Sequence, residues 1–198
     1  MNGGWLLRID IGRLAMGFVS SNWRLLSIFN VVFFSVALGA GLGAGLLFPV
    51  QFYSGQRVYI LPQFLYGSLP LMFLFLFCFN LAIGAFAIVT LPGFLFFPLS
   101  GGLLIFRAVL WGLMLYPLPA GFFLSALPTL VLEGEAYVFA AAVGTTVGYS
   151  WIRRPKGASL WEAFVDACGR DTVAYVFVVL LLLAAALVES ETIMLIQM

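Results

Sequence analysis

Long runs of apolar residues dominate the pattern of this chain, which has 198 residues. An α-helix needs about 20 consecutive apolar residues to cross the hydrocarbon core of a bilayer. Five stretches reach that length, and we expect each to be a membrane-spanning helix. They cover residues 25–50, 67–90, 93–115, 128–151 and 172 to the C-terminal end. The pattern therefore predicts an all-α integral membrane protein.

Two other segments mix apolar and charged residues with helical spacing. Trp5–Phe18 is typical of a helix that lies at the membrane surface. Ala158–Gly169 is similar, and within it Ser159 and Glu162 have the spacing of a capping box, in which each side chain satisfies a free backbone N–H. We expect this second helix to lie on the inner leaflet; the alternative is a docking site for a cytoplasmic partner.

The apolar segment Ala120–Leu127 is too short to span a bilayer and lies between Pro119 and Pro128. Because proline interrupts helices, we expect a break before the fourth span and a short re-entrant or interfacial element there. The chain is then a single membrane domain over residues 1–198. Its parts are an interfacial helix, four spans, a loop with the second interfacial helix, and a fifth span: 1–24, 25–151, 152–171 and 172–198.

Basic residues predict the orientation of these spans. With five crossings, the cations before the first span and those before the fifth lie on the same side, leaving Arg57 as the loop cation opposite. They are Arg8, Arg13, Arg24, Arg153, Arg154, Lys156 and Arg170. The positive-inside rule then predicts a multi-pass protein of the cell membrane, with the N-terminus in the cytoplasm and the C-terminus outside.

Composition excludes several kinds of chemistry. Only 9% of the residues are charged, 64% are hydrophobic, and there is no histidine. Without histidine, His-ligated zinc and Ser–His or Cys–His nucleophile pairs are excluded. Cys78 and Cys168 are far apart and indicate neither a disulfide framework nor a metal site. A net charge of +1 gives no attraction for nucleic acid. We expect no metal, no cofactor and no nucleic-acid partner.

Ionisable residues inside the predicted spans are the candidate functional groups. Each costs at least ~2.5–3.5 kcal/mol on insertion scales, so each needs a partner or a cavity. Arg107, Glu133, Glu135 and Glu189 fall at a similar depth, in the outer half of their spans. We predict that Arg107 pairs with a carboxylate, with Glu133 as the favoured partner. Asn80, in the inner half of the second span, is expected to hydrogen-bond a neighbouring helix.

Small residues recur on two predicted helices. On the fourth span they recur every four residues, and Glu133 precedes them by three, so we expect Glu133 to point into the bundle while Glu135 faces elsewhere. This stripe is Ala136, Ala140, Gly144 and Gly148. On the first span, Gly39 and Gly43 serve either packing within the chain or the seam of a homo-oligomer.

The stretch Leu127–Glu133, with the small-residue stripe after it, resembles the stage II sporulation protein M family of multi-span membrane proteins. Pro128 and Glu133 match the ends of that family's Pro-His-Gly-x-x-Glu element. Residues 106–112 look like its Asn-Gly-x-x-x-Gly segment. Asn80 and Glu189 fall where the family has an Asn in the second span and a late Glu in the last. The resemblance covers about residues 77–191.

Two departures from the family pattern bear on chemistry. Thr129 stands in place of the His, and Arg107 in place of the Asn. Losing the His argues against a catalytic role, while an Arg would balance the charge of Glu133. The family's named member is understood as a membrane scaffold for a cell-wall-remodelling complex. The resemblance therefore implies a scaffold role here.

Three functions compete. The leading hypothesis is a non-enzymatic membrane protein that scaffolds or anchors a complex, with the bilayer, a second copy of the chain and a protein at the membrane as partners. In that case the polar residues form a structural clamp or an assembly contact. The alternative is a transporter or channel for ions or small solutes that uses the same residues as a substrate or proton site. An intramembrane enzyme is disfavoured because all aspartates lie outside the predicted spans. The spans also lack a set of residues that would activate a nucleophile or bind a metal ion.

Overall fold

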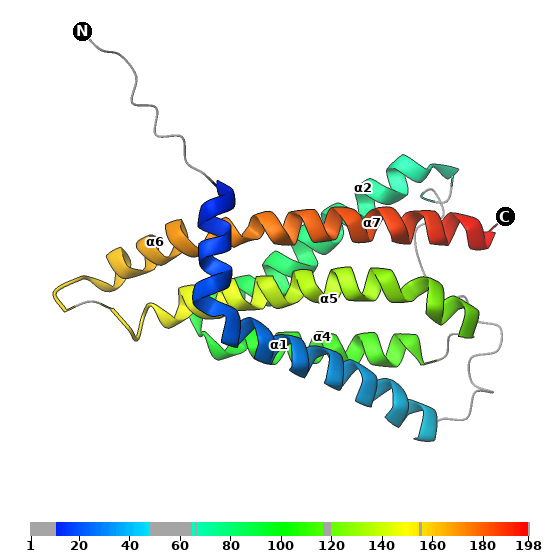
Figure 1. Ribbon diagram of the computed structural model, residues 1–198, viewed down its shortest axis with the longest axis horizontal. Helices are drawn as coiled ribbons and strands as arrows, with labels where there is room; N and C mark the ends of the chain where they lie inside the picture. The colour runs from blue at the N-terminus through cyan, green and yellow to red at the C-terminus, as the bar shows by residue number, and fades with distance from the viewer. Residues whose placement is uncertain (1–10, 48–64, 66, 117–119, 155, 198) are drawn as a thin grey trace, which may run out of the picture.

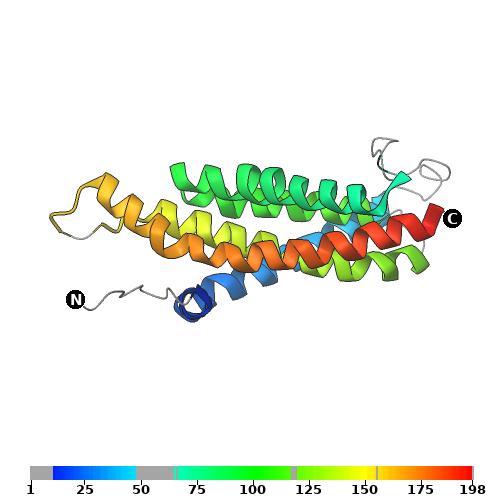
Figure 2. The same ribbon diagram turned by 90° about the horizontal axis from the view of Figure 1, so that it is seen from above.

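The computed structural model describes residues 11–47, 65, 67–116, 120–154 and 156–197, and every regular element within them is a helix. Five helical segments are long and apolar enough to cross a membrane, which confirms the predicted class of a multi-pass helical membrane protein. They are Ile11–Leu47, Leu69–Leu95, Pro98–Leu115, Leu124–Tyr149 and Leu160–Met194. Figures 1 and 2 show most of their length running side by side along the long axis of the molecule.

Nine consecutive elements make up these segments. They are α1 (Ile11–Leu47), α2 (Leu69–Phe79), η3 (Asn80–Thr90), α3 (Leu91–Leu95), α4 (Pro98–Leu115), α5 (Ala120–Tyr149), α6 (Leu160–Asp171), η4 (Thr172–Ala174) and α7 (Tyr175–Gln197). We call the end of the bundle where α6 lies the α6 end (Figure 1).

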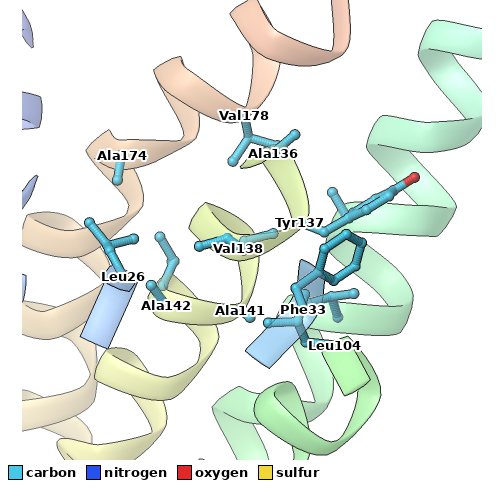
Figure 3. Packing of buried hydrophobic residues seen from close by; sticks show 14 of the residues in the cluster. Leu26, Phe33, Leu104, Ala136, Tyr137, Val138, Ala141, Ala142, Ala174 and Val178 are labelled. Carbon is cyan, nitrogen blue, oxygen red and sulfur yellow. The ribbon is translucent and has the colours of Figure 1, made fainter. Parts of the chain in front are cut away.

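Helix α5 lies at the centre of the bundle. It packs against α1, α4 and α7, and its span is the most buried of the five. Small side chains explain this position, because alanine and glycine allow neighbouring helices to approach closely. Figure 3 shows the core around α5, with Phe33 of α1 and Leu104 of α4 on one side and Val178 of α7 on another.

Helix α1 is bent at Asn22, whose backbone angles (φ −116°, ψ 16°) are not helical. The Asn22 side chain donates a hydrogen bond to the Phe18 carbonyl oxygen at 3.0 Å. Residues 11–21, which we call the transverse segment, run across the α6 end instead of along the bundle (Figure 1). The predicted surface helix Trp5–Phe18 overlaps this segment, and its first part, residues 5–10, lies outside the described residues.

The second crossing changes helix type in its middle. Residues Asn80–Thr90 form a π-helix, and regular helix resumes in α3. The predicted spans 67–90 and 93–115 put the break between them at residues 91–92, but it lies at Phe96, whose backbone is extended (φ −148°, ψ 104°). Pro92 lies just after the junction of η3 and α3, inside a continuous helical run, and does not end the crossing.

The break expected at Pro128 is absent. Pro128 lies inside α5, which is continuous from Ala120, so residues 120–127 are its first turns and not a separate element. Proline is tolerated in membrane helices because neighbouring groups can satisfy the backbone oxygen that it leaves unpaired.

The loop helix α6 begins with the predicted capping box. Ser159 Oγ accepts a hydrogen bond from the Glu162 amide (3.1 Å), and the Glu162 carboxylate accepts one from the Ser159 amide (2.8 Å). The helix ends at Asp171, where η4 leads into α7.

Replacing Ser159 with alanine should weaken the start of α6. Loss of such a cap costs about 0.5–2 kcal/mol of helix stability, so backbone amides in the first turns of α6 should exchange hydrogen about 2- to 30-fold faster. Hydrogen-exchange mass spectrometry measures this. Ser27→Ala, at an exposed position of α1, is the control and should leave α6 unchanged. Equal exchange in all three proteins would contradict the prediction.

Candidate functional site

Glu133 is the deepest acidic residue of the described chain, with 2% of its surface exposed. It lies on α5 one turn before the small-residue stripe, and all four stripe residues are buried. Because helical residues three and four apart share a face, the stripe turns Glu133 toward the interior as the spacing predicts. A carboxylate in such a place requires hydrogen-bond partners.

Hydrogen bonds connect Glu133 to Asn80 of η3, Tyr137 of α5 and Arg107 of α4. The Asn80 amide nitrogen donates to Glu133 Oε1 at 2.5 Å. The Asn80 carbonyl oxygen accepts from the Tyr137 hydroxyl at 3.1 Å. The Tyr137 hydroxyl oxygen in turn accepts from Arg107 Nη2, and the guanidinium carbon lies 4.3 Å from the centroid of the tyrosine ring. We call these four residues the Glu133 network.

The bonds of the Glu133 network all point the same way. Each donor lies toward the Arg107 cation and each acceptor toward the Glu133 carboxylate, with the neutral Tyr137 and Asn80 between them. In a low-dielectric interior, hydrogen bonds in a chain polarise and strengthen one another. The network therefore links a positive and a negative group across three helical segments.

This arrangement corrects the expectation of a direct Arg107–Glu133 pair. Among the described residues, the salt bridges join Arg170 to Asp166 and Asp171, and none joins Arg107 to Glu133. The two predicted partners do converge on one cluster, but Tyr137 and Asn80 mediate between them. Depth along a span indicates level, whereas the direction in which each side chain points depends on helix packing.

Two residues of the site were not predicted from the sequence. Tyr137 is fully buried, and in Figure 3 it lies beside Phe33. Its hydroxyl is directed away from α5, toward Asn80 of η3. Gly84 of η3 faces the network, and a Cβ there would lie 2.9 Å from the Tyr137 hydroxyl and 3.0 Å from Arg107 Nη2. Gly84 therefore leaves room for the two side chains to meet.

Glu189 of α7 adds a third ionisable side chain to the cluster that contains Arg107 and Glu133. Glu133 is within range of Coulomb interaction with both Glu189 and Arg107. Glu189 Oε2 and Arg107 Nε are buried and make no hydrogen bond. Most buried polar atoms are paired, so these two atoms are the open positions of the site.

Glu135 lies apart from the network. Its carboxylate accepts a hydrogen bond from the side-chain amide nitrogen of Asn30, on α1, at 3.2 Å. Glu133 and Glu135 therefore face different neighbours, as their two-residue spacing on a helix requires.

The glycines of α1 are divided between two environments. A Cβ at Gly39 or Gly43 would meet nothing within 4 Å, so neither glycine is in close contact with another helix of the described residues. Gly41 makes such a contact instead, because a Cβ there would lie 3.1 Å from the Gly112 carbonyl oxygen of α4. The seam of a homo-oligomer stays a prediction for Gly39 and Gly43.

The class of protein follows from these observations: a multi-pass helical membrane protein whose central helix carries a buried, charge-linked polar network. In the part of the chain that is described, no group of three or more Cys, Asp or Glu residues could hold a metal ion. Comparisons with protein-family models, with curated proteins and with solved structures find no match.

Proposed function

We propose that this chain is a non-enzymatic integral membrane protein that anchors or scaffolds a membrane complex. The observation that carries the proposal is the close backbone packing at Gly144 and Gly148, farther along α5 than the Glu133 network. A Cβ at Gly144 would overlap with Ser100 Oγ and lie 2.8 Å from the Thr90 carbonyl oxygen, and one at Gly148 would overlap with the Gly93 carbonyl oxygen. Segments in such contact have one arrangement, which suits a fixed platform better than helices that rock.

Hydrogen bonds across the same helices support this proposal. Thr90 Oγ1 donates to the Ala140 carbonyl oxygen (2.9 Å), and Ser100 Oγ donates to the Val89 carbonyl oxygen (2.7 Å). The Glu133 network adds bonds between η3, α4 and α5. Buried polar groups of this kind can specify helix register, and we assign that role to the network.

The surface that would meet a partner is α6. Trp161 and Val165 are 65% and 49% exposed on this amphipathic helix. The resemblance to the stage II sporulation protein M family favours the same role, because that family's named member is understood as a scaffold. Two of the positions that carry the resemblance, Asn80 and Glu133, are hydrogen-bonded to each other.

Site-specific photo-crosslinking in native membranes tests the scaffold role. A photoreactive amino acid at Trp161 or Val165 should give a discrete crosslinked protein band, identified by mass spectrometry and recovered repeatedly. The matched control places the same group at Leu180 or Leu187, which are exposed on α7 and should contact only lipid. Absence of a specific band from α6, or the same bands from both helices, would overturn α6 as the docking surface.

A second candidate function is transport, which the open positions of the site favour. The unpaired Arg107 Nε and Glu189 Oε2 could hold water or a small ion, and the Arg107 guanidinium lies beside Gly84 of the π-helical segment η3. π-Helical segments are frequent at functional sites.

Flux in proteoliposomes separates the two functions. We expect purified wild-type protein to give no selective flux of protons, sodium, chloride or small anions. Glu133→Gln and Arg107→Gln should be equally silent, and Glu191→Gln, an exposed change of the same type on α7, is the matched control. Selective wild-type flux that Glu133→Gln abolishes in folded protein, but Glu191→Gln does not, would replace the scaffold by a transporter.

A further inference from the structure

A second carboxylate lies at membrane depth, outside the Glu133 network. Glu135 is half-buried on α5, within the segment Leu124–Tyr149 that is long and apolar enough to cross a membrane. At 1.5 Å per residue, Glu135 is about 16 Å from one end of that segment and about 21 Å from the other. This position is near the middle of the bilayer, so lipid headgroups do not reach it.

No cation in the described part of the chain neutralises Glu135. The salt bridges there all involve Arg170. The hydrogen bond that Glu135 accepts comes from Asn30, whose side-chain amide is neutral. Arg107, which the sequence places at a similar depth, is bonded to Tyr137 instead. Ionisable residues in hydrocarbon are almost always paired or face water, and Glu135 lacks the charged partner that such a carboxylate usually has.

The side chains that precede Glu135 on the same face of α5 are exposed. Leu127, Val131 and Glu135 follow one another at intervals of four residues, so they share one face of the helix. Leu127 is 38% exposed and Val131 42%, and Leu124, three residues before Leu127, is 66% exposed. Figure 1 shows α1 and α7 running apart over this half of the bundle, with α5 between them. We call these four residues the Glu135 face.

We propose that the Glu135 face binds a transmembrane helix of another protein that carries a lysine or an arginine in the middle of its span. The leucines and Val131 pack against apolar side chains of that helix, and the ammonium or guanidinium group pairs with Glu135. An unpaired cation and an unpaired carboxylate are each costly in hydrocarbon, and pairing offsets both costs. The inference rests on the proposed scaffold role, because it states the chemistry of one member of the complex.

A second copy of this chain does not supply the required cation. In a dimer with two-fold symmetry, the same surface of both copies meets, which brings Glu135 of one copy toward Glu135 of the other. Two such carboxylates repel each other instead of pairing. Arg107 of a second copy is held within its own bundle by Tyr137. Charge complementarity therefore favours a different chain.

Photo-crosslinking to synthetic peptides in liposomes tests the proposal. The purified full chain carries a photoreactive amino acid at Val131, one turn from Glu135. The probes are three transmembrane peptides of leucine and alanine that differ only at the central position, which is lysine, leucine or glutamate. We expect the lysine peptide to reach half-maximal crosslinking at about a tenfold lower peptide-to-lipid ratio than the leucine peptide, as one interhelical hydrogen bond to a charged group would give. The glutamate peptide should crosslink no better than the leucine peptide.

Glu135→Gln should remove the preference for lysine and leave crosslinking at the level of the leucine peptide. Glutamine can still accept the hydrogen bond from Asn30, so this variant should keep the wild-type melting temperature. Glu191→Gln, an exposed change of the same type on α7, should keep the full preference. The photoreactive group at Leu180, exposed on α7, should crosslink the lysine and leucine peptides equally.

Two results would overturn the proposal whatever the stability of the variant. Equal crosslinking of the lysine and leucine peptides to the wild type would show that lipid alone covers the Glu135 face. Crosslinking between two copies at Val131 that outcompetes the lysine peptide would assign the face to a second copy. A preference for lysine that persists in folded Glu135→Gln would show that another group recognises the cation, and would also overturn it.

The failure of this inference and the failure of the scaffold role give different results. Crosslinked bands from α6 in native membranes, without a lysine preference at Val131, would leave the scaffold in place and overturn the pairing at Glu135. A lysine preference without bands from α6 would support the pairing at Glu135 and remove α6 as the docking surface.

Discussion

Glu133→Gln should destabilise the folded protein by about 1–3 kcal/mol, the cost of weakening the charge-assisted hydrogen bond at one end of a buried network. Glutamine keeps an oxygen that can accept the hydrogen bond from Asn80, so the substitution changes charge more than shape. What it removes is the negative end of the network that begins at the Arg107 guanidinium. Unfolding of the purified protein in mixed detergent micelles, followed by circular dichroism, measures this loss.

A second variant separates the charge from the hydrogen bonds. Tyr137→Phe keeps the ring under the Arg107 guanidinium and removes only the hydroxyl that joins Arg107 to Asn80. We expect it to cost about 1–3 kcal/mol, the penalty for leaving buried polar groups unpaired. Tyr149→Phe, at an exposed position of the same helix, should stay within about 0.5 kcal/mol of wild type.

The opposite result is equally informative. A Glu133→Gln protein as stable as the wild type would mean that the Glu133 charge does not compensate Arg107. The network would then act through hydrogen bonds alone, and only Tyr137→Phe would lower stability. Wild-type stability in both variants would contradict the structural role that we assign to the network.

The five helices of membrane-spanning length could be predicted because each long apolar run is long enough to cross a bilayer. The capping box at Ser159 was also predictable, because it depends on two residues three positions apart. The π-helix of η3 and the continuous α5 through Pro128 were not. Both depend on contacts from other helices, which a local pattern of residues does not contain.

Most of the polar residues of the site could be predicted from the sequence, but the hydrogen bonds that connect them could not. The depth of Arg107, Glu133 and Glu189 brought them to one level, and the structure places both Arg107 and Glu189 within electrostatic range of Glu133. Tyr137 was missed because a tyrosine among alanines on an apolar helix looks like an ordinary core residue. Its role depends on Asn80 and Arg107 arriving opposite it from two other segments, which is a property of the packed bundle.

Gly148→Ala should destabilise the bundle by about 1–3 kcal/mol, because overpacking a tight interface forces the helices apart. An added Cβ would overlap with the Gly93 carbonyl oxygen and lie 3.1 Å from the Phe97 Cα. Both are backbone atoms, which cannot rotate away as the end of a flexible side chain can. The same unfolding measurement reports the loss.

Gly39→Ala is the matched control, because its Cβ would meet nothing within 4 Å in the monomer. Alanine favours a helix interior over glycine by roughly 0.5–1 kcal/mol, so this variant should be as stable as the wild type or slightly more so. If Gly148→Ala behaved in the same way, α3 and α5 would have room to separate. That freedom would remove the main argument for a fixed platform and favour a protein whose helices move to transport a solute.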